Sequence, residues 1–183
     1  MKNLLNSLCF AFVLITSVFT SSFCQAQKDM GRWHRVSRVL DGDTIKLDNG
    51  THVRLIGIDA PEMESNAKLT RDLRERHLTV SQELEMGRKS YQFTKQLVEG
   101  KKIYLEFDRL KYDKYHRILA YVFLTNHQFV NAEIVKAGYA YPYTIKPDVK
   151  YSSLFRQLYK EAKENHRGLW NTDRVSKKHF KWF

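Results

Sequence analysis

Short aliphatic runs separated by turn residues open the patterned part of the chain. The turn segments 41–43 and 48–50 divide these runs, and the Asn-Gly pair in the second segment is a strong hairpin signal. The pattern therefore predicts three successive antiparallel strands. They are built on these positions: Val36, Val39, Ile45, Leu47, Val53, Leu55, Ile56 and Ile58.

Longer segments with helical character follow. The stretch 64–85 is highly charged, lacks Gly and Pro, and is typical of a solvated helix or a mobile loop. Segment 87–100 places apolar residues at helical spacing, so it predicts a helix that stops at Gly100.

Two further helices are expected near the C-terminus. The first begins at Asn131 as its N-cap and ends near Gly138. The second spans 152–165 and is followed by Gly168, after which Leu169 and Trp170 can pack back. Its apolar stripe consists of Leu154, Phe155, Leu158, Tyr159 and Ala162.

Two more strands complete the expected sheet. Residues 101–108 alternate apolar and polar positions, and 118–124 form a second apolar run, with a charged aromatic loop at 109–117 between them. Five short strands, with helices between and after them, predict an α+β fold in which a small barrel has helices packed on its outside. At 183 residues and 43% hydrophobic content, the chain fits one domain.

The first 26 residues have the features of a secretory signal peptide. Lys2 precedes an apolar run over 8–19, and Ala26 is a small residue at a plausible cleavage point. The run is shorter than the roughly 20 residues of a membrane-spanning helix, so no membrane association is expected after cleavage. A retained anchor and lipid attachment at Cys24 are the alternatives. Cys9 and Cys24 both lie in this segment, so the mature chain folds without disulfides.

The chain is strongly basic. Its formal net charge is +11, and its pI of about 9.6 suits a polyanionic partner such as nucleic acid, acidic polysaccharide or an anionic surface. A contribution to solubility alone is the alternative. The segment 177–183 alternates basic and aromatic residues and is a candidate accessory contact for DNA. A terminal segment without function, or one packed on the barrel, is the other interpretation.

Carboxylates interrupt the first predicted strands. Neighbouring strands of a hairpin can bring Asp43 and Asp59 together at one end of the sheet, and all-oxygen ligation suits calcium or magnesium rather than zinc. Glu62 then lies beside the metal, where it can orient or deprotonate a water. Arg54, five residues before Asp59, lies on the opposite face if the strand is regular and on the same face if a bulge intervenes. The alternative interpretation makes these acids turn caps, as we expect for Asp41 and Asp48.

Three motifs in register identify a resemblance. DGDT at 41–44, RLIGIDAPE at 54–62 and DKYHR at 113–117 resemble the thermonuclease family, whose namesake is staphylococcal nuclease. The similarity runs from about 35 to 170 and includes FTKQLVE, LAYVF, VNAEIVKAG and RGLW. It implies a five-stranded OB-fold barrel with about three flanking helices. It divides the chain into a signal peptide at 1–26 and a nuclease-like domain at 27–183, with its core at about 33–172 and a basic aromatic tail at 173–183.

The resemblance also implies an activity and a site. The family hydrolyses DNA and RNA with calcium and releases 3′-phosphate products, and we expect a monomer without a stable protein partner. The implied calcium ligands are Asp43, Asp59 and the backbone carbonyl of Ala60. The implied catalytic residues are Glu62 as general base, with Arg54 and Arg117 on the scissile phosphate. The implied substrate-binding residues are Asp113, Lys114, Tyr115, Tyr141 and Tyr143.

The chain departs from the namesake at three places. Ala60 stands where the namesake has threonine, which leaves a backbone ligand intact. His116 replaces a glycine in the loop that carries Arg117, and the stretch 62–87 is longer. A non-catalytic OB-fold nucleic-acid-binding module is the second hypothesis, and binding to anionic cell surfaces is the third. Neither has a chemical need for the acids and arginines together.

Overall fold

The computed structural model describes residues 33–64, 73 and 79–171. The predicted signal peptide and the basic aromatic tail lie outside these residues. The strands are β1 (Trp33–Val39), β2 (Thr44–Leu47), β3 (His52–Leu55), β4 (Gly57–Asp59), β5 (Lys102–Glu106), β6 (Ile118–Leu124) and β7 (Tyr141–Tyr143). The helices are α3 (Val80–Val98), α4 (Val130–Lys136) and α5 (Ser152–Glu164), followed by the 3-10 turn η1 (Gly168–Trp170).

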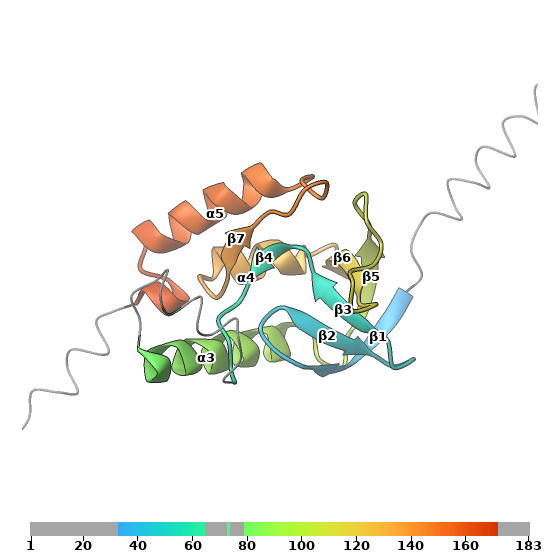
Figure 1. The fold of residues 1–183 in the computed structure, drawn as a ribbon, viewed down its shortest axis with the longest axis horizontal. Helices are drawn as coiled ribbons and strands as arrows, with labels where there is room; N and C mark the ends of the chain where they lie inside the picture. Colours follow the sequence, from blue (N-terminus) through green and yellow to red (C-terminus); the bar gives the residue numbers. More distant parts are fainter. Residues whose placement is uncertain (1–32, 65–72, 74–78, 172–183) are drawn as a thin grey trace, which may run out of the picture. The chain divides into compact units, whose positions relative to one another are not determined.

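Five strands close into a barrel in the order β1-β2-β3-β6-β5 (Figure 1). All neighbouring pairs are antiparallel except β3 and β6, which run parallel. The remaining strands, β4 and β7, form a separate antiparallel pair. The five-stranded α+β barrel with three helices is therefore confirmed for the described part of the chain.

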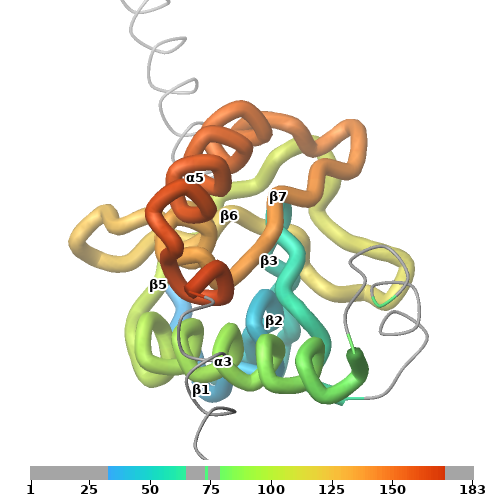
Figure 2. Tube along the Cα trace, turned by 90° about the vertical axis from the view of Figure 1, so that its left-hand side faces the viewer, coloured from blue at the N-terminus to red at the C-terminus, as the bar shows by residue number. Residues whose placement is uncertain are grey.

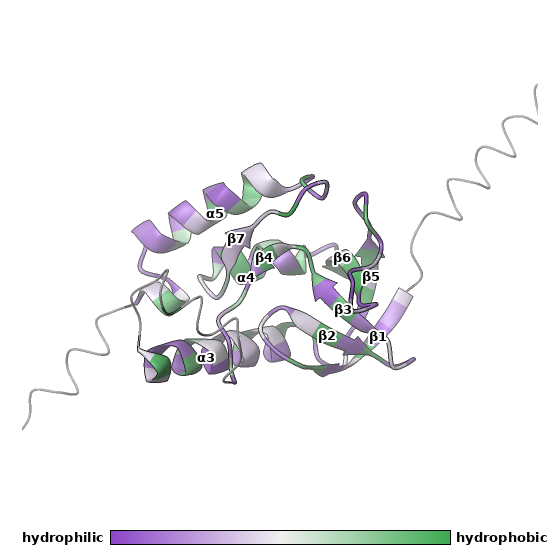
Figure 3. Ribbon diagram, viewed as in Figure 1, coloured by the Kyte–Doolittle hydropathy of each residue, from purple (hydrophilic) through white to green (hydrophobic). Residues whose placement is uncertain are grey.

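The core fills the barrel and extends beneath the helices. Alternate strand positions such as Val36, Ile45, Val53 and Ile103 are fully buried, which is the period expected of strands with one buried face. Each such side chain contributes roughly 1.5–3 kcal/mol through removal from water. Helices α3 and α5 mix hydrophobic and hydrophilic residues along their length (Figure 3). Helix α5 buries Phe155 and Ala162, whereas the buried positions of α3 are mostly small or polar: Glu83, Gly87, Ser90, Thr94 and Val98.

The third predicted strand is broken in two. Gly57 adopts φ +80, and a Cβ at this position would collide with the ring of Phe155 on α5. The backbone of Ile56 is held on both sides: its N–H donates to Ala120 at 3.1 Å, and its carbonyl accepts from Asn131 at 2.9 Å. The chain therefore leaves the barrel after β3, and Asp59 ends β4 instead of the third barrel strand.

Two helix boundaries and one buried position differ from the expected ones. Helix α3 begins at Val80, capped by Thr79 with Gln82, so the end of the charged stretch is helical. The predicted cap Asn131 is wrong: it lies inside α4, buried, and bonds Val122 and Ile56. Leu154 is exposed although it was placed in the apolar stripe of α5. The ends predicted near Gly100 and Gly138 hold, and both glycines have positive φ.

The elements outside the barrel frame the region after β3. Figures 1 and 2 both place the β4 and β7 pair between α3 and α5. None of the described helices is both long and apolar enough to cross a membrane.

Candidate active site

One pocket of about 760 Å³ gathers most of the predicted site residues. Strands β2, β3 and β4 form one side, and the loops 107–117 and 144–151 form the other. The predicted residues lining it are Asp43, Arg54, Asp59, Glu62, Asp113, Lys114, Tyr115, Arg117 and Tyr143. A second hollow of about 800 Å³, beside Tyr91 and Lys95 on α3, contains none of them.

Two buried carboxylates share one guanidinium on the floor of this pocket. Arg54 places one terminal nitrogen 3.0 Å from Asp43 Oδ2 and the other 3.1 Å from Asp59 Oδ1. Both acids are 5% exposed. Asp43 Oδ2 also accepts the backbone N–H of Ala60 at 2.7 Å, and its Oδ1 accepts the Thr44 hydroxyl at 3.3 Å. The carboxylates are thus held together by directed hydrogen bonds and not by chance proximity.

The break between β3 and β4 determines whether Arg54 and Asp59 lie on the same face. Regular pleating would separate Arg54 from Asp59, which is five residues later. The turn at Ile56 and Gly57 instead brings Arg54 and Asp59 to the same side. The Arg54 guanidinium also donates to the carbonyls of Leu55 at 2.9 Å and Ile58 at 3.1 Å. The backbone that exits the barrel therefore wraps around this side chain.

Acidic side chains outnumber basic ones along this pocket. Burial raises the pKa of the Asp43 carboxyl to about 8, against the attraction of Arg54, and Asp41 and Asp59 push in the same direction as burial. Burial lowers the pKa of Arg54, but the negative charges of Asp43 and Asp59 outweigh burial and raise that pKa above its ordinary value. An additional cation would favour the ionised form of Asp43, because like charges held close are stabilised by an opposite charge.

Helix α3 positions the main chain of Glu62. Gly87 faces the carbonyl of Glu62, and a Cβ on Gly87 would overlap that oxygen. Glu62 lines the pocket beside Asp41, Asp43 and Asp59. The packing of α3 on this turn therefore fixes the backbone position of Glu62, from which its side chain extends.

The loop after β5 carries the second arginine. Asp113 accepts the Arg117 Nε–H at 2.7 Å and the backbone N–H groups of Arg117 and Tyr115 at 3.0 and 2.9 Å. Partial burial raises the pKa of Asp113, but these hydrogen bonds outweigh it and hold the pKa below 3.8. Arg117 lies over the Tyr115 ring, 5.6 Å from its centre. Asp113 therefore orders the loop around Arg117.

His116 occupies a position suited to glycine. Its φ is +62, in the left-handed region, and its side chain is exposed. His116 therefore has the left-handed backbone conformation that a glycine adopts easily, and because it carries a Cβ this conformation has an energetic cost.

The two C-terminal tyrosines have different surroundings. Tyr143 is exposed and lines the pocket. Tyr141 is not among the lining residues, and its ring packs edge-on against Trp170 at 5.6 Å and near Tyr159 at 6.1 Å. Tyr143 is therefore the one of the two that faces the pocket.

Several lining residues were not singled out from the sequence as site residues. Asp41 was interpreted as a turn cap, and its Oδ1 does accept the Asp43 N–H at 2.9 Å, yet it also lines the pocket. The spacing of two acids around Gly42 was the signal for it. The other such residues include Leu110, Tyr112, Ile145 and Asp148, which follow no recognisable motif.

The donor set fits a hard divalent cation. Asp43, Asp59 and the carbonyl of Ala60 supply only oxygen, the ligand type preferred by calcium and magnesium. Among the described residues no group of three or more His, Cys, Asp or Glu side chains has ligand geometry. The predicted set contains two side chains, so a cation there would depend on the backbone and on water for its other ligands.

Comparisons with known proteins identify the family of the chain. Residues 52–172 match the profile of the family described as staphylococcal nuclease homologue. A thermonuclease of Staphylococcus intermedius is 35% identical over 144 residues, covering 76% of this chain and 77% of that protein. A thermonuclease of Staphylococcus hyicus is 31% identical, covering 75% of each chain. An uncharacterised endonuclease of Escherichia coli is 32% identical, covering 75% of this chain and 76% of its own. The chain belongs to the staphylococcal nuclease homologue family.

Proposed function

We propose that this protein is an exported nuclease that hydrolyses phosphodiester bonds of DNA and RNA, with calcium, and leaves 3′-phosphate ends. The observation that carries the proposal is the pair of buried carboxylates bridged by Arg54, in a pocket that also contains Glu62 and Arg117. Relatives named thermonuclease and endonuclease support a nuclease activity.

The calcium ion would be held by Asp43, Asp59 and the backbone carbonyl of Ala60. When bound, it supplies positive charge to the phosphate and makes a bound water easier to ionise. The pair of buried carboxylates on the pocket floor is the feature of this chain that supports such a site. With few protein ligands and an open pocket, the expected dissociation constant is about 0.1 to 1 mM.

The protein's own groups have distinct roles in this proposal. Glu62 accepts the proton of the attacking water, as a carboxylate in the pocket with the required acceptor oxygen. Arg117 and Arg54 provide charged donors for the phosphate oxygens, and such donors matter most when the phosphorus carries extra negative charge. Losing one of them is expected to cost roughly 3–4 kcal/mol in the barrier, or several hundredfold in rate.

Substrate is attracted by charge and held by rings. The net charge of +11 favours a polyanion, and this long-range attraction does not distinguish DNA from RNA. Tyr115 and Tyr143 are exposed at the pocket. A base can stack on the ring of Tyr143, whereas Lys114 and Arg117 lie over the ring of Tyr115, so these three residues form a cationic and aromatic group that can contact a phosphate.

A binding module without catalysis is the competing proposal. Such a module gains nothing from carboxylates in its binding pocket, because they repel phosphate. Asp43, Asp59 and Glu62 all line the pocket with Arg54 and Arg117. This combination favours hydrolysis over binding alone.

The decisive experiment incubates residues 27–183 with plasmid DNA, linear DNA and RNA, each with calcium, magnesium or chelator. We expect cleavage with calcium, none with chelator, and product ends that phosphatase treatment makes extendable by a polymerase. Equal activity in excess chelator would contradict the calcium requirement. Export is tested separately by expressing the full chain and sequencing the N-terminus of the exported protein, which is expected to begin at Gln27.

A further inference from the structure

Exposed apolar side chains concentrate at the active-site pocket. Among the described residues nine large hydrophobic side chains are exposed, and five of them line this one pocket. Tyr115 and Tyr143 already have a proposed role. The remaining three are Leu110, Tyr112 and Ile145, exposed by 43%, 61% and 58%. We call these three side chains the apolar wall.

The apolar wall stands on a rigid frame made by two loops. Asp148, a buried residue, accepts the backbone N–H groups of Arg109 and Leu110 with one oxygen, each at 2.9 Å. Its own N–H donates to the carbonyl of Ile145 at 3.0 Å. One carboxylate therefore fixes Leu110 and Ile145 beside each other, although they are far apart in the sequence.

Further hydrogen bonds support the same frame. Asp108 accepts the Lys150 N–H at 2.9 Å and the Tyr121 hydroxyl at 3.0 Å, which ties the two loops together a second time. Tyr112 bridges to Ile118, at the start of β6. The wall is thus exposed but held in place, and a surface fixed in advance loses little conformational freedom when a ligand binds.

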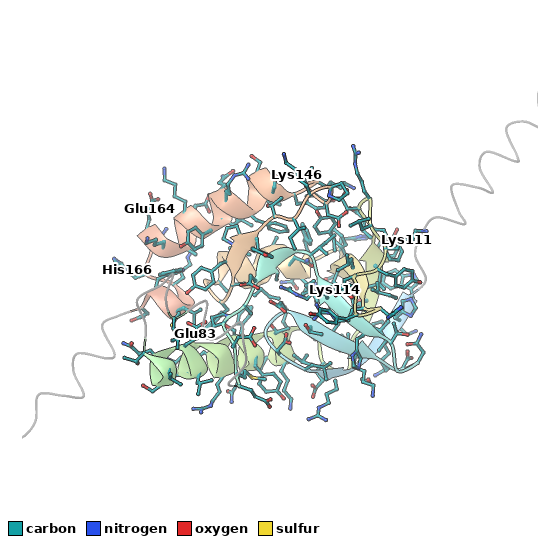
Figure 4. The ribbon with its side chains drawn as sticks, in the orientation of Figure 1. Glu83, Lys111, Lys114, Lys146, Glu164 and His166 are labelled. Carbon is teal, nitrogen blue, oxygen red and sulfur yellow. The ribbon has the colours of Figure 1, made fainter. Side chains whose placement is uncertain are left out.

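Positive charges lie on the same two loops. Lys111 and Lys114 belong to the loop between β5 and β6, and Lys146 belongs to the loop between β7 and α5 (Figure 4). Of these three, Lys114 lines the pocket, so an occupant of the wall meets apolar surface and a cationic group together. An exposed base with its phosphates has that combination, because its faces are apolar and its backbone is anionic.

We propose that the apolar wall binds an unpaired base of the nucleic-acid substrate, separate from the base that stacks on Tyr143. The proposal deepens the nuclease function and rests on it. The wall is continuous with the pocket that holds the carboxylates, so the base it binds belongs to a nucleotide near the cleaved bond. A base inside a duplex cannot reach it, because its faces are covered by neighbouring base pairs.

The test compares Tyr112→Ala and Ile145→Ala with Val149→Ala. Val149 is an exposed apolar residue of the same loop as Ile145 and does not line the pocket. On a single-stranded oligonucleotide we expect the two wall variants to raise KM at least about fivefold with little change in kcat. Val149→Ala should leave KM unchanged. Tyr112→Phe keeps the ring and should keep KM.

Abasic oligonucleotides separate base binding from a structural effect. An abasic nucleotide is moved one position at a time along the substrate. At one position the abasic nucleotide should raise the KM of wild type to the KM that Tyr112→Ala has for the intact oligonucleotide. The KM of Tyr112→Ala should not rise further with that abasic substrate. If Tyr112→Ala weakens every abasic substrate as much as the intact one, the wall does not hold a base and the proposal fails.

A binding measurement distinguishes failure of this proposal from failure of the nuclease function. Fluorescence anisotropy of the same oligonucleotide uses Glu62→Gln protein with and without Tyr112→Ala. If wild type cleaves the oligonucleotide and the wall variants have the same KM as Val149→Ala, base binding by the wall is refuted and the nuclease function stands. No cleavage, with binding weakened by Tyr112→Ala, overturns the function and leaves the wall. Neither cleavage nor binding overturns both.

A second copy of the chain is the competing occupant. Sedimentation of wild type and of Ile145→Ala at high protein concentration detects it. A dimer that dissociates in the variant would show that the wall is a subunit interface and overturn base binding. A monomer in both, together with the raised KM, supports it.

Discussion

Arg54 contacts both carboxylates of the pocket floor through separate nitrogens, and this contact gives it two tasks. In the proposed mechanism it donates to the substrate phosphate, and in the structure it is the counter-charge of two buried acids. Glu62 lines the same pocket and is half-buried, whereas both acids that Arg54 contacts are buried. Substitution of these two residues should therefore have different effects on stability, although both should reduce cleavage.

Glu62→Gln keeps the size of the side chain and removes the base. We expect kcat to fall at least 100-fold, roughly 2.7 kcal/mol in the barrier, while DNA affinity changes less than about tenfold because the surface cations remain. Glu64→Gln is the matched control, since Glu64 is exposed and is not among the lining residues. If wild type cleaves no faster than Glu62→Gln under calcium but binds DNA tightly, the binding-module hypothesis replaces the nuclease.

Arg54→Ala leaves two buried carboxylates without their shared partner. Removing one partner of a buried ion pair typically costs about 3–5 kcal/mol, so the free energy of unfolding in chelator should fall by an amount of that order. Calcium should restore part of the loss, because the ion supplies the missing positive charge. Urea denaturation with chelator and with calcium measures both effects, and Arg38→Ala, at an exposed position, is the control. Equal loss in both variants would mean that the floor does not depend on Arg54.

At the scale of the elements, the site depends on a helix that supplies none of its lining residues. Helix α3 approaches the turn after β4 so closely that Gly87 has no room for a methyl group beside the Glu62 carbonyl. The break between β3 and β4 is a second such feature, since it brings Arg54 to Asp59. In both cases packing outside the pocket decides where a functional side chain lies.

Gly87→Ala tests the packing of α3. Helix propensity alone predicts stabilisation of about 1 kcal/mol, but the added methyl group must displace the Glu62 backbone. We therefore expect lower stability and a fall in kcat of at least about tenfold, measured by thermal unfolding and steady-state kinetics. Gln96→Ala, at an exposed site on the same helix, should change neither appreciably. A more stable and fully active Gly87→Ala variant would refute the proposed contact.

The chain as a whole is strongly basic, whereas its candidate site gathers several carboxylates. In the proposed function the charge of +11 attracts nucleic acid from a distance, whereas the carboxylates would act only where the pocket admits a phosphate. Binding and cleavage should consequently respond to different variables. Salt should weaken the first, and loss of calcium should abolish the second.

Salt dependence measures the electrostatic part of binding. With Glu62→Gln protein, the affinity for single-stranded DNA should fall at least about tenfold between about 50 and about 200 mM salt. Deletion after Asp173 removes four basic residues of the tail. If the tail is an accessory contact, the logarithmic slope becomes shallower while the fold survives, as followed by circular dichroism. An unchanged affinity and slope would rule out that role.

Local chemistry made much of the fold predictable from the sequence. The aliphatic alternation, the Asn-Gly turn and the positive-φ glycines that end helices act over a few residues, so they predicted the barrel strands and the ends of α3 and α4. The motif resemblance added which acids and arginines belong together. Asn131 was misinterpreted because its buried hydrogen bonds to Val122 and Ile56 are tertiary, and they outweigh its preference for a cap.

By itself the sequence determined the class of fold, the basic surface and the residue types of the site. Only the tertiary structure decided that Arg54 reaches Asp59, since that contact depends on the turn at Ile56 and Gly57. The hydrogen bond from Asn131 on α4 holds this turn, and Phe155 packs so close to Gly57 that a Cβ would not fit there. It also decided that Tyr143 faces the pocket while Tyr141 packs against Trp170. The same holds for Leu110, Tyr112 and Ile145, which two loops bring to one wall. Contacts between residues far apart in the chain arise from the packing of whole elements, and no local pattern encodes them.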